Sequence, residues 1–168
     1  PCRRSLPDLE PAAFSFNGPQ GMCPACQGLG HRLAVDPARV VADPEATIAG
    51  GALRPWATAM ARRAGWVYRY AMAVAKAFAV PLDVPWKRLP KAARDCVLFG
   101  KGAGEIVVPW GDKKSEGIWR TTYRGLVPSI ERRFFEARSE GAKRRFADYI
   151  VEAVCRDCDG TRLREESR

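Results

Sequence analysis

The longest hydrophobic pattern with helical spacing runs through residues 56–79. Many alanines in this stretch favour a helix, and larger apolar residues recur near one face. These residues are Met60, Val67, Tyr70, Val74 and Phe78. Gly65 interrupts the pattern and Pro81 follows it, so we expect a helix that is divided near Gly65 and ends before Pro81.

A shorter helix and a hairpin are predicted next along the chain. Residues 90–98 favour a helix because a proline begins the segment and Gly100 follows its end. Residues 105–109 and 118–123 are strand-like, and the polar segment 111–117 lies between them. This arrangement predicts an antiparallel hairpin.

Two basic amphipathic helices are expected after the hairpin. The apolar stripe of the first is formed by Leu126, Ile130 and Phe134. The stripe of the second is formed by Phe146, Tyr149 and Ile150. Arginines and lysines occupy the remaining positions, and we expect the second helix to run toward Cys155.

The first third of the chain is less regular. Residues 1–30 contain several prolines and glycines that break helices, and the alternation over 14–16 predicts a short strand. Residues 31–55 are predicted to be a turn-rich connector. Within it, Asp36 or Asp43 would cap a short helix, because a proline follows each of them at the first helical position.

Two short cysteine motifs lie near the two ends of this pattern. One is Cys23-Pro-Ala-Cys26 and the other is Cys155-Arg-Asp-Cys158, and in each a glycine follows two residues later. Such a turn presents two thiolates on one side, and tetrahedral zinc takes four ligands at zinc–sulfur distances of about 2.3 Å. We therefore predict a structural Zn²⁺ site made by Cys23, Cys26, Cys155 and Cys158.

The cysteines admit other interpretations. Buried free thiols or two disulfides are the alternatives, but the chain has six cysteines without the dense spacing of a secreted disulfide framework or an apolar signal segment. A redox site would need a single motif. The lone histidine, His31, is expected at the surface because four thiolates complete the metal shell, and Cys96 is expected to be a buried thiol.

The expected fold class is α+β: a helix-rich insertion domain with a small antiparallel hairpin, on a four-cysteine zinc-knuckle base. We expect residues 1–30 to form the N-terminal part of the base and residues 31–150 the insertion domain. Residues 151–168 would be the return segment of the base.

Composition adds one clear indication about partners. The net charge is +9, and the basic excess is spread along the chain. A basic domain attracts polyanions such as nucleic acid, although solubility alone is an alternative reason for the charge. No stretch approaches the roughly 20 apolar residues of a membrane helix, so we expect a cytoplasmic protein with no membrane partner. Neither a phosphate-binding loop nor a nucleophile with its base is present, so no catalytic residue is predicted.

The motifs resemble one family in detail. The stretch Phe14-Ser-Phe-Asn-Gly-Pro-Gln-Gly-Met-Cys23-Pro-Ala-Cys26-Gln-Gly-Leu-Gly30 closely resembles a segment of the UvrA family, a component of the ABC excinuclease. The far end, Cys155-Arg-Asp-Cys158-Asp-Gly-Thr-Arg-Leu163, and the segment Ser129-Ile-Glu-Arg-Arg-Phe134 are similar to it as well. The resemblance covers essentially the whole chain and is strongest at its ends.

The resemblance implies a function. UvrA is a dimeric ABC-type ATPase that senses DNA damage in bacterial nucleotide excision repair and loads UvrB, so the implied partners are damaged DNA, UvrB and a second UvrA. The family carries a mobile, DNA-facing domain inserted between such cysteine pairs. ATP would bind outside this chain. Cys2 matches one cysteine of a further pair, which leads us to expect a fragment that continues into the ATPase signature region.

The basic residues define a predicted DNA-contacting surface. Phosphate contacts give affinity without reading sequence, which suits a sensor of deformed duplex. The residues predicted to make them are Arg132, Arg133, Lys143, Arg144, Arg145, Lys113 and Lys114. Arg120 and Arg124 could instead pair with acids across the sheet. Trp110 and Trp119 are expected in the core, with stacking on unpaired bases as the alternative.

Two other functions compete with DNA contact. A chaperone module like the DnaJ cysteine-rich region uses similar cysteine motifs, but it needs four closely spaced copies. A purely structural docking domain with no nucleic-acid contact is the third hypothesis. Salt-dependent binding of duplex DNA would indicate DNA contact, whereas binding of an apolar peptide would indicate the chaperone module.

Overall fold

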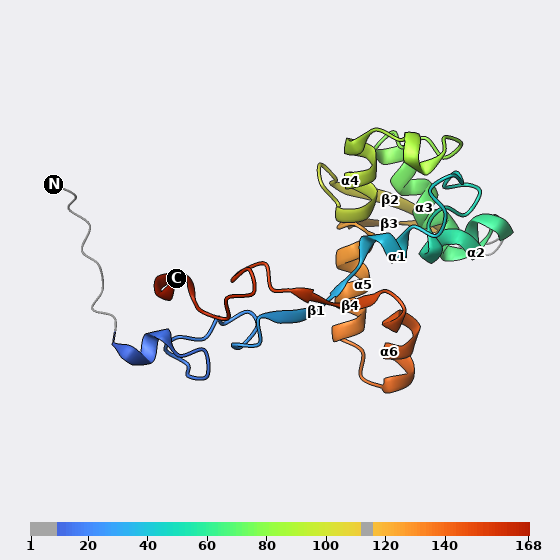
Figure 1. The fold of residues 1–168 in the computed structure, drawn as a ribbon. Coiled ribbons are helices and arrows are strands. Elements are labelled where there is room, and N and C mark those ends of the chain that lie inside the picture. Colours follow the sequence, from blue (N-terminus) through green and yellow to red (C-terminus); the bar gives the residue numbers. More distant parts are fainter. Residues whose placement is uncertain (1–9, 112–115) are drawn as a thin grey trace. The chain divides into compact units, whose positions relative to one another are not determined.

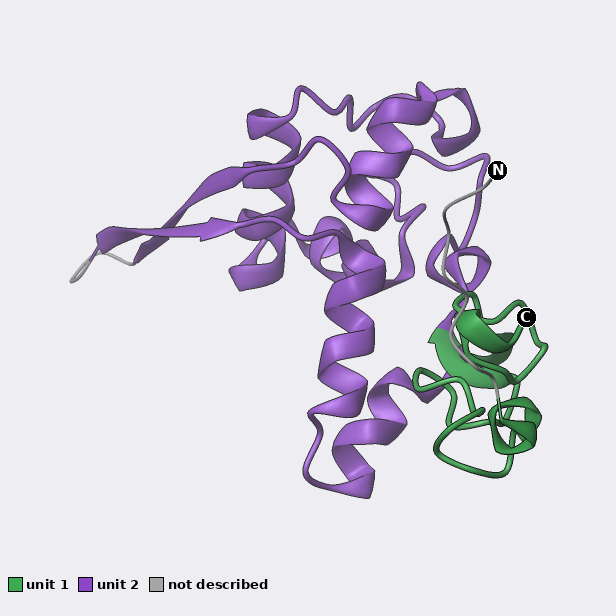
Figure 2. Cartoon of the chain, turned by 90° about the vertical axis from the view of Figure 1, so that its left-hand side faces the viewer, with its two compact units in different colours: residues 1–34, 151–168 green, residues 35–150 purple. Residues whose placement is uncertain are grey.

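The computed structural model describes residues 10–111 and 116–168 (Figure 1). The chain divides into two compact units, shown in Figure 2. Unit 1 comprises residues 1–34 and 151–168, and unit 2 comprises residues 35–150. Among the described helices, none combines the length and the apolar composition needed to cross a bilayer.

Unit 1 is built from short elements that the two ends of the chain contribute. Its elements are η1 (Pro11–Phe14), most of β1 (His31–Val35), most of β4 (Ile150–Val154) and η3 (Glu165–Ser167). Strands β1 and β4 pair with one another. Backbone bonds from Cys155 N to Gly30 O and from Asp36 N to Tyr149 O, both 2.9 Å, flank the pair, so the strands run antiparallel.

Three local predictions are wrong here. The helix expected to continue toward Cys155 gives way to β4, and part of the expected connector is β1. The alternation over 14–16 does not produce a strand, because the chain forms the 3₁₀ turn η1 after Glu10. A proline at the start of a helical turn loses no hydrogen bond, so Pro11 begins this turn rather than preventing it.

Unit 2 contains the longer helices and the hairpin. Its elements are α1 (Pro37–Val40), α2 (Arg54–Arg62), α3 (Gly65–Ala77), η2 (Trp86–Arg88), α4 (Lys91–Phe99), β2 (Glu105–Gly111), β3 (Glu116–Thr122), α5 (Leu126–Phe135) and α6 (Glu140–Ala147). The predicted division near Gly65 is confirmed, as are the helix that ends before Gly100 and the hairpin.

Local sequence signals set several of these boundaries. Asp36 caps α1 by accepting a hydrogen bond of 2.9 Å from Ala38 N, as predicted for one of the two candidate aspartates. Ser139 caps α6 in the same way through Ala142 N. Gly100 ends α4 in the left-handed region, at φ 70°.

The core of unit 2 lies between the hairpin and the helices. Along β2, Ile106 and Val108 are fully buried while the residues between and around them are exposed, so one strand face points inward. This strand packs against α3, and α5 packs against both α4 and α6. The predicted α+β class, helix-rich with small antiparallel sheets, is confirmed.

Candidate metal centre and nucleic-acid interface

The four motif cysteines come together in unit 1. All four Sγ atoms lie within 4.8 Å of one another, and all four side chains are buried. Cys23 Sγ lies 4.0 Å from Cys155 Sγ, and Cys26 Sγ lies 3.7 Å from Cys158 Sγ. None of the described cysteines forms a disulfide. The cluster is therefore a set of four convergent thiols that could hold a metal ion.

The two motifs adopt matching backbone conformations. In the first, Gln27 and Gly28 have φ angles of 53° and 78°. In the second, Asp159 and Gly160 have φ angles of 47° and 78° at the same positions. The left-handed turn brings the chain back over the sulfurs, which is why a glycine follows each cysteine pair. The fourth residue after the pair, Gly30 or Arg162, is also left-handed.

Backbone hydrogen bonds hold the two motifs against each other. Cys23 N donates to Arg162 O at 2.7 Å, and Arg164 N donates to Gly21 O at 2.9 Å. On the other side of the cluster, Cys155 N donates to Gly30 O. Hydrogen bonds on both sides thus fix the spacing of the two halves.

The electrostatics of the cluster favour at least one thiolate. Burial by itself raises the pKa of Cys26, but the Gly30 amide, 3.2 Å from Sγ, and the neighbouring thiols bring that pKa down to about 7. Burial raises the pKa of Cys158 to about 11. A cation bound here would replace the thiol protons, because cysteine binds metal as a thiolate.

The remaining histidine and cysteines do not belong to the described cluster of four thiols. His31 is partly exposed, and its Nε2 lies 2.6 Å from Oε1 of Glu152 on the paired strand. Its expected position at the surface is confirmed. Cys96 is buried within α4 of unit 2, as expected for a structural thiol. Cys2 lies outside the described residues.

The predicted DNA-contacting residues divide between two helices of unit 2 and a segment outside the described residues. Arg132 and Arg133 lie on α5, and the predicted basic trio of α6 follows at Lys143, Arg144 and Arg145. The four arginines are exposed, whereas Lys143 is half-buried. Lys113 and Lys114 lie outside the described residues.

Two of these basic residues form ion pairs with acidic neighbours. Arg132 Nη1 lies 3.9 Å from Glu136 Oε2, and Lys143 Nζ lies 3.3 Å from Glu140 Oε1. Within residues 10–111 and 116–168, no carboxylate lies within ion-pair distance of Arg133, Arg144 or Arg145. These three arginines are the strongest candidates to bind an external anion.

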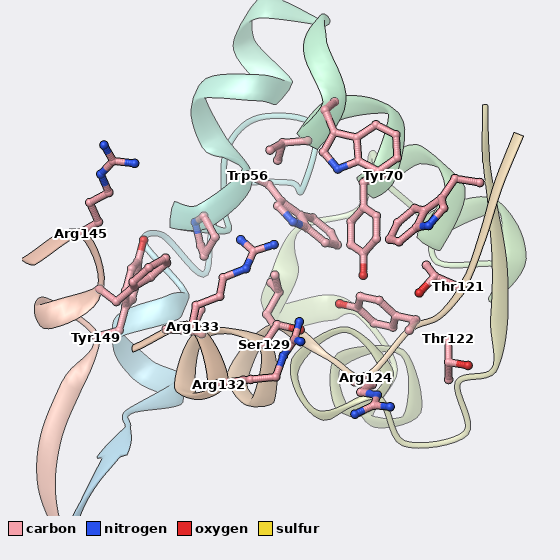
Figure 3. Close-up of a pocket in the computed structure, with 18 residues that line it drawn as sticks. Trp56, Tyr70, Thr121, Thr122, Arg124, Ser129, Arg132, Arg133, Arg145 and Tyr149 are labelled. Carbon is pink, nitrogen blue, oxygen red and sulfur yellow. The ribbon is translucent and has the colours of Figure 1, made fainter. Parts of the chain in front are cut away.

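A cavity of about 530 Å³ opens on unit 2 beside these arginines. Arg132, Arg133 and Arg145 line it, together with Arg124 from the segment after β3. Figure 3 shows Arg133 extending from α5 toward the rings of Trp56 and Tyr70. The cavity thus combines cations from α5 and α6 with aromatic rings from α2 and α3.

Two tryptophans depart from the expected core packing. Trp110 and Trp119 are 44% and 42% exposed, although Trp119 lies directly opposite the buried Val108 in the hairpin. Arg120 does pair with an acid across the hairpin, because its Nη1 lies 2.9 Å from Glu105 Oε1. Arg124 instead lines the cavity. Sequence reasoning missed the cavity residues Trp66, Tyr70 and Arg124 as a group, since no local spacing connects them.

Comparisons with known proteins identify the family. The family model described as the UvrA DNA-binding domain matches residues 36–148. The UvrABC system protein A of Xylella fastidiosa strain Temecula1 is 37% identical over 171 residues, and that of Escherichia coli strain K12 is 36% identical over 168 residues. Each alignment covers 99% of this chain and 17% of the relative.

A solved structure supports the same assignment. The crystal structure of UvrA2 from Deinococcus radiodurans matches with a TM-score of 0.70 and 29% identity, over 92% of this chain and 20% of that chain. The chain is thus an α+β module with a four-cysteine cluster, similar in fold to part of a UvrA protein. It belongs to the UvrA DNA-binding domain family, and it spans about 17% of the length of the curated relatives it matches.

Proposed function

We propose that this chain is the zinc-anchored, DNA-contacting part of a damage-sensing UvrA protein of nucleotide excision repair. The observation that carries the proposal is a set of arginines on α5 and α6, without carboxylate partners among the described residues, within the span of the UvrA DNA-binding domain model. Arginine–phosphate contacts bind any sequence, which is what recognition of damage at arbitrary positions requires.

Zinc is the proposed metal. Four ligands at about 2.3 Å in a tetrahedron lie about 3.8 Å from one another. Two of the Sγ–Sγ separations, 3.7 and 4.0 Å, are close to this value, and all four atoms lie within 4.8 Å of one another. Cys23, Cys26, Cys155 and Cys158 would hold the ion, which supplies no catalytic chemistry in a closed four-thiolate shell. Its role would be to tie residues 1–30 and 151–168 into one base that carries the inserted residues 31–150.

The proposed interface consists of the basic residues of α5, of α6 and of the segment between β2 and β3. Arg132, Arg133, Lys143, Arg144 and Arg145 would contact phosphates of damaged duplex without reading its sequence, and Lys113 and Lys114 would join them. In the whole protein, ATP would bind outside this chain. UvrB and a second UvrA would be the protein partners, in the cytoplasm.

The test is the salt dependence of duplex binding. Each phosphate contact contributes a slope of about 0.9 to the plot of log affinity against log salt concentration. Arg133, Arg144 and Arg145 would be replaced together by glutamine in the zinc-loaded chain, and affinity for a labelled duplex measured by anisotropy. The slope is expected to fall by about 0.9 for each phosphate contact that the substitutions remove.

A matched control removes the same charge elsewhere on unit 2. Arg62, Lys76 and Arg88 are exposed and do not line the cavity, so their replacement by glutamine is expected to leave most of the slope intact. Equal losses in the two triple variants would mean that net charge alone drives binding. An unchanged slope in the first variant would reject the proposed interface and favour a structural docking role.

A further inference from the structure

The cavity of unit 2 has an aromatic wall with continuous ring contacts. The ring centroids of Trp66 and Trp119 are 5.2 Å apart, those of Trp119 and Tyr70 are 6.4 Å apart, and those of Tyr70 and Tyr123 are 6.0 Å apart. Trp66 and Trp119 remain 43% and 42% exposed. Large aromatic surfaces are normally covered in a folded domain, so the exposure of these two rings is unusual. The exposed rings are available to stack on a flat ligand.

The remaining wall of the cavity is cationic. Four arginines line it, and none of the described residues that line it is acidic. Arg133 and Arg145 have no carboxylate partner in the part of the chain that the structure describes. Burial raises the pKa of Tyr70 despite the nearby Arg133, so its hydroxyl remains a neutral donor. The cavity is therefore suited to a ligand that joins a flat ring to an anion.

We propose that this cavity binds a single unstacked nucleotide, with the base against Trp66 and Trp119 and the phosphate at Arg133. The proposal rests on the proposed function, because it assigns to this cavity one nucleotide of the DNA that unit 2 contacts.

Size and chemistry favour a nucleotide over other anions. The cavity volume lies within the range of about 300–1,000 Å³ that is typical of small-ligand sites. A base that stays stacked in a duplex cannot reach the inside of such a cavity, whereas one extruded nucleotide can enter it. An acidic peptide would satisfy the arginines but would leave the aromatic wall uncovered. Base stacking uses that wall and tolerates any base.

The experiment compares two DNA probes with the zinc-loaded chain. One is a short labelled duplex, and the other is the same duplex with a single unpaired thymine. Stacking of one base is expected to make binding of the second probe about five-fold tighter or more. Trp119→Ala is expected to abolish this preference while leaving affinity for the intact duplex unchanged, and Trp119→Phe is expected to retain most of it.

Trp110→Ala is the matched control for the aromatic wall. Trp110 lies on the same hairpin with nearly the same exposed fraction, but it does not line the cavity. Its replacement is expected to keep the preference for the unpaired thymine. Equal loss in Trp110→Ala and Trp119→Ala would overturn the assignment to this cavity.

The outcomes separate this inference from the proposed function. Salt-dependent binding with equal affinity for both probes would overturn the nucleotide site and leave the DNA-contacting surface standing. Oligothymidylate is the third probe, read by quenching of tryptophan fluorescence. Quenching that Trp119→Ala removes, without any duplex binding, would support the cavity and reject the proposed interface. Competition by poly-glutamate as strong as that by oligothymidylate would show recognition of charge alone and would overturn the inference.

Discussion

The hydroxyl group of Tyr123 donates a hydrogen bond of 2.6 Å to the carbonyl oxygen of Val97. Both residues are buried, and the bond ties the segment after β3 to the last turn of α4. Burial raises the pKa of Tyr123 well above its ordinary value, so the phenol remains a donor at every pH of practical interest. The same ring closes the aromatic wall beside Tyr70.

Tyr123→Phe is expected to destabilise the chain by about 1–2 kcal/mol, because the Val97 carbonyl would lose its partner in a buried position. Urea denaturation followed by circular dichroism measures the change. For a chain of this size, the midpoint of thermal unfolding should fall by about 2–4 °C for each kcal/mol. Tyr68→Phe is the control, since the Tyr68 hydroxyl makes no hydrogen bond within the described residues. Equal stability of wild type and Tyr123→Phe would contradict the assigned bond.

Two glycines at and after the C-terminus of α4 are expected to differ in their tolerance of alanine. Gly100 and Gly102 both have φ 70°, but a Cβ on Gly100 would lie 2.5 Å from the backbone of Arg124, whereas a Cβ on Gly102 would meet nothing within 4 Å. Gly102→Ala is expected to cost about 1 kcal/mol from backbone strain alone. Gly100→Ala should cost at least about 2 kcal/mol more because packed backbone must move. Similar unfolding midpoints for the two variants would disprove the close approach.

Removing one thiol tests the metal centre. Cys158→Ser is expected to lose the single equivalent of zinc that elemental analysis should find in the wild-type chain. Because metal binding is coupled to folding, hydrogen exchange should accelerate at the amides that join the motifs, Cys23 and Cys155 among them. Cys96→Ala is the matched control, since this buried thiol lies in unit 2 and should leave the zinc content intact. Full zinc occupancy in Cys158→Ser would exclude the four-thiolate site.

His31 provides the complementary test of the ligand set. Its side chain pairs with Glu152, and both are substantially exposed. His31→Ala should therefore retain the metal and change stability by no more than about 1 kcal/mol, the usual range for exposed ion pairs. Zinc content and urea unfolding are measured on the same preparation. Loss of zinc in this variant would place the histidine in the metal shell, contrary to the geometry.

Local sequence signals predicted much of the fold correctly. The alanine-rich helices around Gly65, the cap at Asp36, the helix end at Gly100 and the hairpin all depend on residues within a few positions of each other. Such signals act through backbone conformations that neighbouring residues already favour. The cysteine spacing was equally informative, because a C-x-x-C spacing places two ligands on one turn.

Apart from the cysteine cluster, the features that join distant segments were not predicted from the sequence. Strand β4 replaces the expected helix because its backbone pairs with β1, more than a hundred residues away in sequence, and local propensity does not encode that pairing. The aromatic cavity likewise gathers Trp66, Trp119 and Arg133 from α3, β3 and α5. Residue order was therefore enough to predict the short turns and helices, and the paired motifs also predicted that the four thiols meet. The other long-range contacts were not predictable, because burial and long-range hydrogen bonds are formed only in the folded chain.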